Sequence, residues 1–137
     1  MIKVNIQEII NKSLGFKPYQ IGNQTGWTKR VNRKDGYTNI FKKLPSGTVL
    51  KETIDSKNLV WAKRGLLSNG NEMQSYICDS FGGRVIHITN KSGLGIYAQT
   101  KKYYDFKTKQ YLPMITTHTH KHLYSFIDKI KMHMGIV

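Results

Sequence analysis

Hydrophobic residues near the N-terminus follow the period of an amphipathic helix. In the segment 5–14 the isoleucines and the leucine recur every three or four residues, so they would share one helix face. Asn5, followed three residues later by Glu8, resembles a capping box, and Gly15 is well placed to end the helix. The pattern predicts a short helix over residues 5–14, followed by a polar, glycine-bearing connection over residues 19–26.

The pattern becomes that of short strands between Trp27 and Thr117. Segments rich in Val, Ile, Thr, Tyr and Phe alternate with turn signals such as Asp35-Gly36, which recur roughly every 10 to 14 residues. This spacing is typical of consecutive antiparallel strands. We expect strands near residues 27–33, 37–44, 48–54, 59–66, 73–81, 84–89, 95–105 and 110–117.

The helical period returns after Thr117. Five apolar residues form one stripe, while polar residues, mainly lysines, occupy the rest of the helix. Thr116 or Thr117 is placed to cap the start, and the helix is expected to cover one face or one end of the sheet. The apolar stripe consists of Leu123, Phe126, Ile127, Ile130 and Met134.

These elements place the chain in the α+β class. We expect one domain over residues 1–137, with a helix at about 5–14, a β-meander at about 27–117 and a helix at about 118–134. The run of short strands predicts a curved antiparallel β-meander or a partly closed barrel, flanked by a short N-terminal helix and a C-terminal amphipathic helix. A chain of this length buries about two-thirds of its unfolded surface, which is enough for one core.

The single cysteine bears on the cellular compartment. Cys78 has no second cysteine for an intramolecular disulfide, which is typical of a reducing environment. No run approaches the roughly 18 apolar residues of a membrane-spanning helix, and residues 1–10 do not have the pattern of a signal peptide. We therefore expect a cytoplasmic protein without a transmembrane segment. The abundance of Lys, Asn, Ile and Tyr is compatible with an AT-rich genome, such as that of a phage or a low-GC bacterium.

Charge restricts the function more than any other property. The chain has 22 Lys and Arg against 8 Asp and Glu, a formal net charge of +14. Such an excess repels itself in the compact state, and a polyanion commonly compensates it. Nucleic acid, DNA or RNA, is therefore the expected partner, with anionic membranes and an acidic protein as alternatives.

The densest basic segment surrounds the Asp35-Gly36 turn. Aspartate and glycine are favoured in tight hairpin turns, so the flanking residues are predicted to form two antiparallel strands. Cations interleaved with aromatic rings suit phosphates and base faces respectively. The alternative interpretation is a solvated hairpin whose rings are core. The predicted leading site is Trp27, Lys29, Arg30, Arg33, Lys34, Tyr37, Lys42 and Lys43.

Two further clusters combine rings and cations in the same way. Alternation along a strand would put Trp61 beside Lys63, and Tyr103 beside Lys101, on one face. If the sheet brings the clusters together, they form a basic surface for sequence-tolerant binding of DNA or RNA. These clusters add Trp61, Lys63, Arg64, Lys101, Lys102 and Tyr103 to the predicted site.

Histidines support an alternative function as an enzyme. Metal-independent RNA cleavage needs a base for the 2′-OH proton, an acid for the leaving oxygen and a cation for the phosphate. His87 with His118 or His120 could supply the acid and the base, so a small ribonuclease or toxin-like enzyme is the first alternative. His118, His120 and His122 could also share one face as zinc ligands, but no fourth ligand is evident, and exposed histidines are favoured over a metal site.

Other chemistry has little support in the sequence. Asp105-Phe106-Lys107 has the D-x-K spacing of a nuclease superfamily, with Asp79 upstream, but so short a pattern is expected by chance in a lysine-rich chain. No P-loop or dinucleotide-binding glycine motif occurs in a strand-to-helix context, so we expect no cofactor. A third possibility is a phage-type inhibitor or adaptor that binds an acidic host protein.

Overall fold

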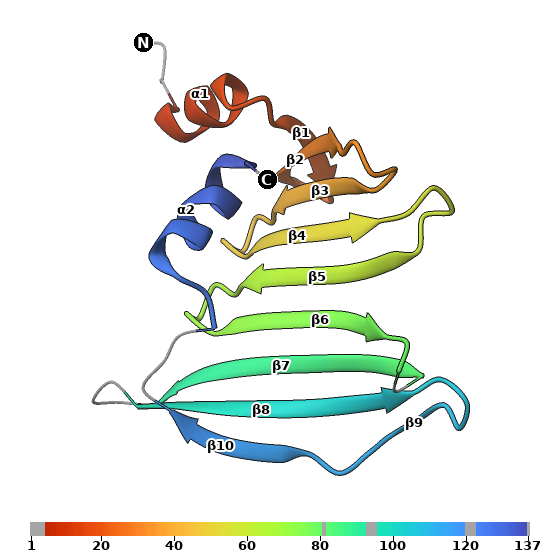
Figure 1. The fold of residues 1–137 in the computed structure, drawn as a ribbon. Coiled ribbons are helices and arrows are strands. Elements are labelled where there is room, and N and C mark those ends of the chain that lie inside the picture. The colour runs from red at the N-terminus through yellow and green to blue at the C-terminus, as the bar shows by residue number, and fades with distance from the viewer. Residues whose placement is uncertain (1–4, 81, 93–95, 120–122, 137) are drawn as a thin grey trace.

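The structure is built around one antiparallel sheet. The computed structural model describes residues 5–80, 82–92, 96–119 and 123–136. Figure 1 shows the helices lying beside the sheet. The elements are α1 (Ile6–Ser13), β1 (Lys17–Ile21), β2 (Gln24–Asn32), β3 (Thr38–Lys43), β4 (Val49–Ile54), β5 (Val60–Leu66), β6 (Glu72–Cys78), β7 (Gly83–Ser92), β8 (Ile96–Asp105), β9 (Gln110–Tyr111), β10 (Ile115–Thr119) and α2 (Phe126–Met134).

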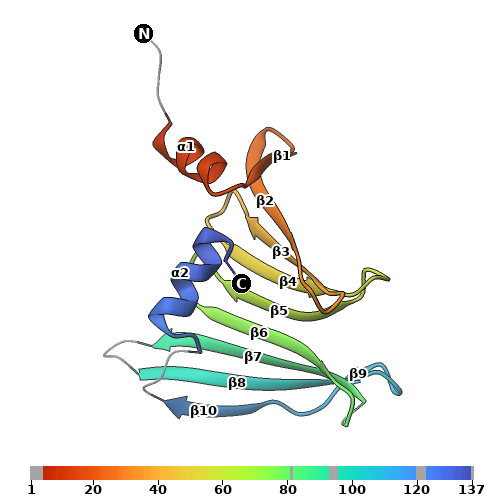
Figure 2. The same ribbon diagram turned by 45° about the horizontal axis from the view of Figure 1, so that its top comes forward.

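The ten strands follow chain order across the sheet. Each strand from β1 to β8 pairs with the next, and β10 pairs with β8, while the short β9 pairs with the end of β8. Within the described ranges the edge strands β1 and β10 do not pair with each other, so the sheet is open. Figure 2 shows the strand direction turning steadily from β1 to β10. The predicted α+β class and the antiparallel meander between two helices are confirmed.

Four consecutive hairpins close with the same loop geometry. In each, the residue that directly follows the first strand donates its N–H to the carbonyl four residues later, at 2.8 to 3.1 Å. The third loop residue has a positive φ, as in a three-residue hairpin loop with a left-handed residue. The predicted Asp35-Gly36 turn is one of the four. The hydrogen bonds run from Arg33 to Tyr37, Leu44 to Thr48, Asp55 to Leu59 and Leu67 to Asn71, and the positive-φ residues are Gly36, Gly47, Asn58 and Gly70.

The first strand pair was not anticipated from the sequence. Residues 19–26 were expected to form a connection, but β1 and β2 pair from Lys17 opposite Thr28 to the turn at Gly22, where φ is 61°. The ring of Tyr19 occupies the space that a Cβ on Gly26 would need. An aromatic ring over a glycine on the neighbouring strand supplies the packing that a glycine cannot, which is why a polar, glycine-bearing segment is a strand here.

The C-terminal helix begins later than the sequence indicated. Residues 115–119 pair with β8 as strand β10, so Thr116 and Thr117 lie in a strand and do not cap the helix. The N-cap is Ser125, whose Oγ accepts the N–H of Asp128 at 3.1 Å. The helix ends at Gly135, which has a left-handed conformation.

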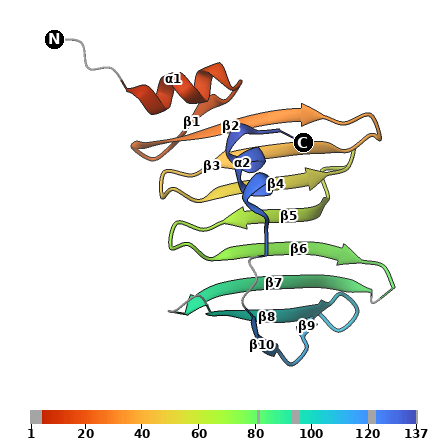
Figure 3. The same cartoon turned by 60° about the vertical axis from the view of Figure 1, so that its left-hand side comes forward.

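The apolar stripe predicted for this helix faces outward. Phe126 is 76 % exposed and Ile127 is 64 % exposed, whereas Met132 and Tyr124 are buried. The stripe is therefore not the buried side of the helix, although α2 does lie over one face of the sheet, as expected, and crosses β2–β5 (Figure 3). The sheet beneath α2 carries charged side chains as well as apolar ones, so the side of the helix that meets it includes Lys129.

A small core lies between the helices and the first half of the sheet. Phe41 and Val49 are buried on β3 and β4, and Phe16, which follows α1, packs beside Gly135. Lys43 of β3 lies with its Nζ 4.4 Å from the centroid of the Phe16 ring. Among the residues that the structure describes, no helix lies over the remainder of this sheet face, from β6 to β10 (Figure 1).

Candidate nucleic-acid interface

The strand register aligns cationic and polar side chains in one row across the sheet. Directly opposed residues on neighbouring strands share a face, and alternation puts every second residue of a strand on that face. The registers of β2 to β8 connect seven residues in this way. We call these residues the basic row: Lys29, Phe41, Lys51, Arg64, Gln74, His87 and Lys101.

The basic row lies on the same face as α2, which we call the helix face. The Arg64 guanidinium is 5.5 Å from the ring centroid of Tyr124, just before α2, and the Lys29 stem approaches Gly135. The row itself contains no carboxylate. Strands lie about 4.8 Å apart, so the four steps from Lys51 to Lys101 cover roughly 19 Å.

Lys51 and Arg64 form the most concentrated positive charge in the row. They are directly opposed on β4 and β5, and both are half-buried. Burial lowers the pKa of Lys51, and the neighbouring Arg64 and Arg33 lower it further, while Asp128 acts in the opposite direction. With Thr53 and other residues these cations line a pocket of about 220 Å³.

The other end of the row combines a histidine, a lysine and two tyrosines. The His87 ring stacks on Tyr76 with centroids 5.8 Å apart, and the His87 Nε2 lies 3.4 Å from the Tyr76 hydroxyl. Lys101 lies with its Nζ 5.3 Å from the ring centroid of Tyr103. Burial, and next the charge of Lys101, lowers the pKa of His87 below its ordinary value of 6.5. His87 is therefore neutral at pH 7, and the positive charge at this end comes from Lys101.

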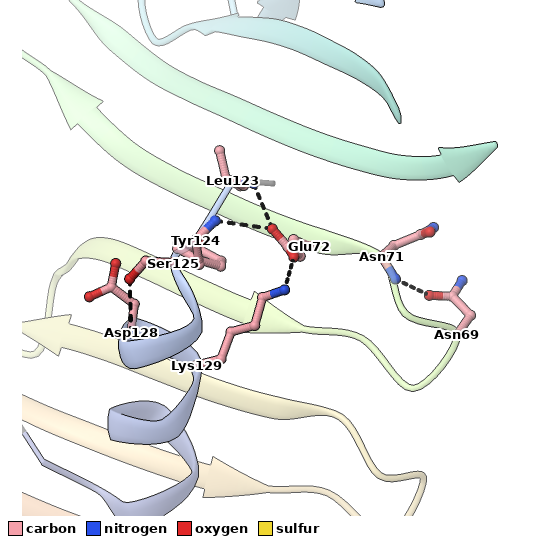
Figure 4. A network of polar contacts seen from close by, with 8 residues as sticks. All are labelled: Asn69, Asn71, Glu72, Leu123, Tyr124, Ser125, Asp128 and Lys129. Atoms are coloured by element: carbon pink, nitrogen blue, oxygen red, sulfur yellow. Dashed lines mark hydrogen bonds and ion pairs between the residues drawn. The ribbon is translucent and has the colours of Figure 1, made fainter. Parts of the chain in front are cut away.

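The buried carboxylate beside the row, that of Glu72, already has hydrogen-bond and ion-pair partners. Glu72 of β6 is 3 % exposed, accepts the backbone N–H groups of Leu123 and Tyr124 at 2.7 and 3.1 Å, and pairs with Lys129 at 2.6 Å. Figure 4 shows how these contacts fasten the start of α2 to the sheet. Because Glu72 is committed to α2, it does not cancel the charge of Lys51 and Arg64.

The structure divides the residues predicted from the sequence between the two faces of the sheet. The helix face carries a member of each basic cluster, whereas other cations of the same clusters lie on the opposite face. One of these, Lys42, pairs with Glu52 at 2.9 Å. On the helix face are Trp27, Lys29, Arg33, Lys43, Arg64, Lys101 and Tyr103, and on the opposite face are Arg30, Lys42, Lys63 and Lys102. Lys34 lies in the loop between β2 and β3, and Tyr37 is the residue that closes this loop.

Several of these residues make contacts within the protein. Lys43 donates from Nζ to Asn11 Oδ1 at 2.8 Å, which joins β3 to α1. Trp61 has no partner on β4, because the register shifts there, and its Nε1 donates to Asp55 Oδ2 at 2.9 Å. Trp61 and Lys63 thus do not form the regular ring-and-cation pair that alternation indicated.

Lys51 and Gln74 were missed by sequence reasoning. Neither lies in a segment dense in both cations and rings, so composition gives no signal. The signal that could have found them is register: the common hairpin loop sets Lys51 between Phe41 and Arg64, and Arg64 opposite Gln74.

The histidines of the ribonuclease alternative are separated by the sheet. His118 pairs with Ala98, and His87 pairs with Lys101, three residues along β8, so the two histidines belong to opposite faces. His120, like His122, lies outside the described residues. Asp105 accepts the N–H of Lys107 at 3.0 Å, so the D-x-K carboxylate takes part in a loop contact.

Comparisons with known proteins do not assign a family. Family models, curated proteins and solved structures all yield no match to this chain. In the part of the chain that the structure describes, neither helix has the length and apolar character needed to cross a bilayer.

Proposed function

We propose that the protein binds single-stranded nucleic acid, largely independently of sequence, with the strand lying along the basic row. The observation that carries this proposal is the register of β4 to β8, which aligns Lys51, Arg64 and Lys101 on one face without an intervening carboxylate. Cations on one face of the sheet, with only neutral side chains between them, suit a polymer with a negatively charged backbone.

Aromatic rings next to the row support a single-stranded ligand. Tyr76 and Tyr103 lie two residues along their strands from Gln74 and Lys101, and Val85 lies between the two tyrosines in register. Sheet surfaces that bind single strands use such rings as stacking platforms, since every base has a face that stacks. A duplex would present its phosphates but keep its bases stacked within itself.

The test is a titration of fluorescently labelled single-stranded and duplex DNA and RNA at several salt concentrations in the presence of a chelator. Neutralising about four phosphates of a single strand gives a log-log salt slope of roughly −3. We expect salt-sensitive binding with that slope, tighter for single strands than for duplexes, and intact strands on a denaturing gel. The absence of binding to any of the four at low salt would contradict the proposal.

The same gel tests the enzymatic alternative. His87 is a half-buried, neutral imidazole beside Lys101 in the basic row, which suits a general base next to a bound phosphate. Its acid partner would have to be a group other than His118, which belongs to the opposite face. Cleavage of RNA in chelator that is lost in His87→Ala would favour this function over simple binding.

A further inference from the structure

The pocket at Lys51 and Arg64 combines three cations within one small volume. It measures about 220 Å³ and is lined by side chains from β4, β5 and β6 and by Arg33, which directly follows β2. Two of its cations, Lys51 and Arg64, belong to the basic row, and Arg33 lies beside the row. The full lining is Arg33, Lys51, Thr53, Ala62, Arg64 and Gln74.

The charge of this pocket is only partly compensated. Arg33 pairs with Asp35 at 2.5 Å, but in the described part of the chain neither Lys51 nor Arg64 has a carboxylate within ion-pair distance. Burial and the two arginines lower the pKa of Lys51, which indicates that its surroundings disfavour its positive charge. An anion in the pocket would reverse this cost.

A neutral donor lies beside the cations. The Gln74 side chain lines the pocket and carries an amide donor. Thr53, which also lines the pocket, already donates its hydroxyl to Asn39 Oδ1 at 2.8 Å. The Gln74 amide is therefore the neutral group that the pocket offers to an oxyanion, next to its three cations.

The open part of the basic row ends at this pocket. The next residue of the row beyond Lys51 is Phe41, which is 0 % exposed. The residue after that, Lys29, has its stem packed near Gly135 and its Nζ 5.9 Å from the centroid of the Phe16 ring. A strand that follows the row from Lys101 therefore meets the covered part of the sheet immediately after the pocket.

We propose that this pocket binds the terminal phosphate of a nucleic-acid strand. This inference rests on the proposed function, because it concerns one end of the strand that the basic row binds. A terminal phosphomonoester carries nearly two negative charges at pH 7 and three accepting oxygens, whereas a backbone diester carries one charge. Three cations in a confined site discriminate in favour of the group with more charge.

The experiment compares three versions of one labelled oligonucleotide, with a 5′-phosphate, a 3′-phosphate or hydroxyl groups at both ends. We expect one phosphorylated end to bind about tenfold more tightly than the hydroxyl form. Lys51→Met should weaken binding of the hydroxyl form several-fold, as expected for a cation of the basic row, and in addition should abolish the difference between the phosphorylated and hydroxyl forms. Arg64→Lys keeps the charge but loses the bidentate geometry, so it should reduce the preference.

The matched control is Lys63→Met, which removes a lysine from the same strand but from the opposite face. It should retain the full preference for the phosphorylated end. Circular dichroism and thermal unfolding of each variant establish that it is folded. Equal affinity for all three ends in the unsubstituted protein overturns the terminal-phosphate proposal, even when salt-sensitive binding upholds the proposed function.

A second measurement tests anion binding in the pocket independently of oligonucleotide binding. Pyrophosphate titrated into the protein and followed by NMR should shift the side-chain signals of Lys51 and Arg64, and the shift should be absent in Lys51→Met. If no oligonucleotide binds but pyrophosphate still shifts these signals, the proposed function fails and the pocket stands as an anion site. Signals that do not move with pyrophosphate would count against the pocket.

Discussion

Glu72 and Lys129 form a buried ion pair that joins β6 to α2. The Glu72 Oε1 lies 2.6 Å from the Lys129 Nζ, and the other carboxylate oxygen accepts two backbone N–H groups at the start of the helix segment (Figure 4). Glu72→Gln leaves hydrogen-bond donors and a half-buried ammonium group without their charged acceptor. We expect it to lower the free energy of unfolding by about 1–3 kcal/mol in urea titrations.

A matched control distinguishes this buried contact from an ordinary ion pair. Glu52 on the opposite face pairs with Lys42 at 2.9 Å, but the lysine side chain is 38 % exposed. Glu52→Gln should therefore cost less than about 1 kcal/mol. If both substitutions have the same effect, Glu72 does not have the special role in holding α2 that its contacts indicate.

Adjacent lysines on β8 test whether the proposed nucleic-acid binding depends on one face of the sheet. Lys101 belongs to the basic row, whereas Lys102 belongs to the opposite face, with its Nζ 4.2 Å from the centroid of the Tyr111 ring. Lys101→Met should weaken binding several-fold at low salt and reduce the magnitude of the log-log salt slope by about 0.7. Lys102→Met should change neither quantity, and an equal loss in both variants would mean that binding depends on overall charge and not on this face.

Histidine titration predicts a loss of stability on acidification. Burial lowers the pKa of both His87 and His133 below 6.5, with further contributions from Lys101 and Lys43 respectively. Below that pH the unfolded chain takes up protons that the folded protein does not yet bind, so the free energy of unfolding falls as the pH drops from about 7. The loss stops once the pH lies below the folded pKa values.

The measurement is urea unfolding between pH 7 and pH 5. The double variant His87→Gln, His133→Gln should lose less stability over this range than the unsubstituted protein. His118→Gln is the control, because it removes a histidine from β10 on the opposite face of the sheet from His87, and it should keep the original profile. An unchanged profile in the double variant would assign the pH dependence to other groups.

The outward orientation of the α2 stripe can be tested by paired substitutions. Met132 is 2 % exposed, so Met132→Ala should cost about 2–4 kcal/mol through lost burial and a cavity. Phe126 is 76 % exposed, so Phe126→Ser should change stability by less than about 0.5 kcal/mol. The reverse order of effects would mean that the stripe packs on the sheet, as the sequence pattern alone suggests.

Much of the fold could be predicted because the turns between its strands are specified by short local sequences. The turn signal at Asp35-Gly36 marks a real hairpin, and the alternation of the two strands beside it is regular. The pair β1 and β2 escaped prediction because its stabilising contact, the Tyr19 ring over Gly26, becomes visible only when the strands are paired. Residues 115–119 are rich in β-branched residues and form a strand as far as the prediction of 110–117 reaches, but pairing with β8 extends that strand to Thr119 and delays the helix.

The candidate site was harder to predict because it depends on register. The cations of each cluster are evident in the sequence, but a strand places neighbouring cations on opposite faces, as with Lys63 and Arg64. Composition therefore overestimates the number of cations on one surface. Composition also fails to identify Lys51 and Gln74, because they lie in segments that are not dense in cations and rings. Their place in the basic row depends on the residues opposite them on neighbouring strands.

The repeated hairpin loop has a consequence for how much nucleic acid the sheet would cover. Each of the four hairpins fixes its register through its own loop hydrogen bonds, so the sheet is extended strand by strand without long-range connections. Insertion of one more hairpin between two existing ones would lengthen the row by about 10 Å and leave the remaining pairs intact. The occluded site size of such proteins would then scale with strand number. Oligonucleotides of increasing length would measure it, because affinity should stop rising once the strand spans the row.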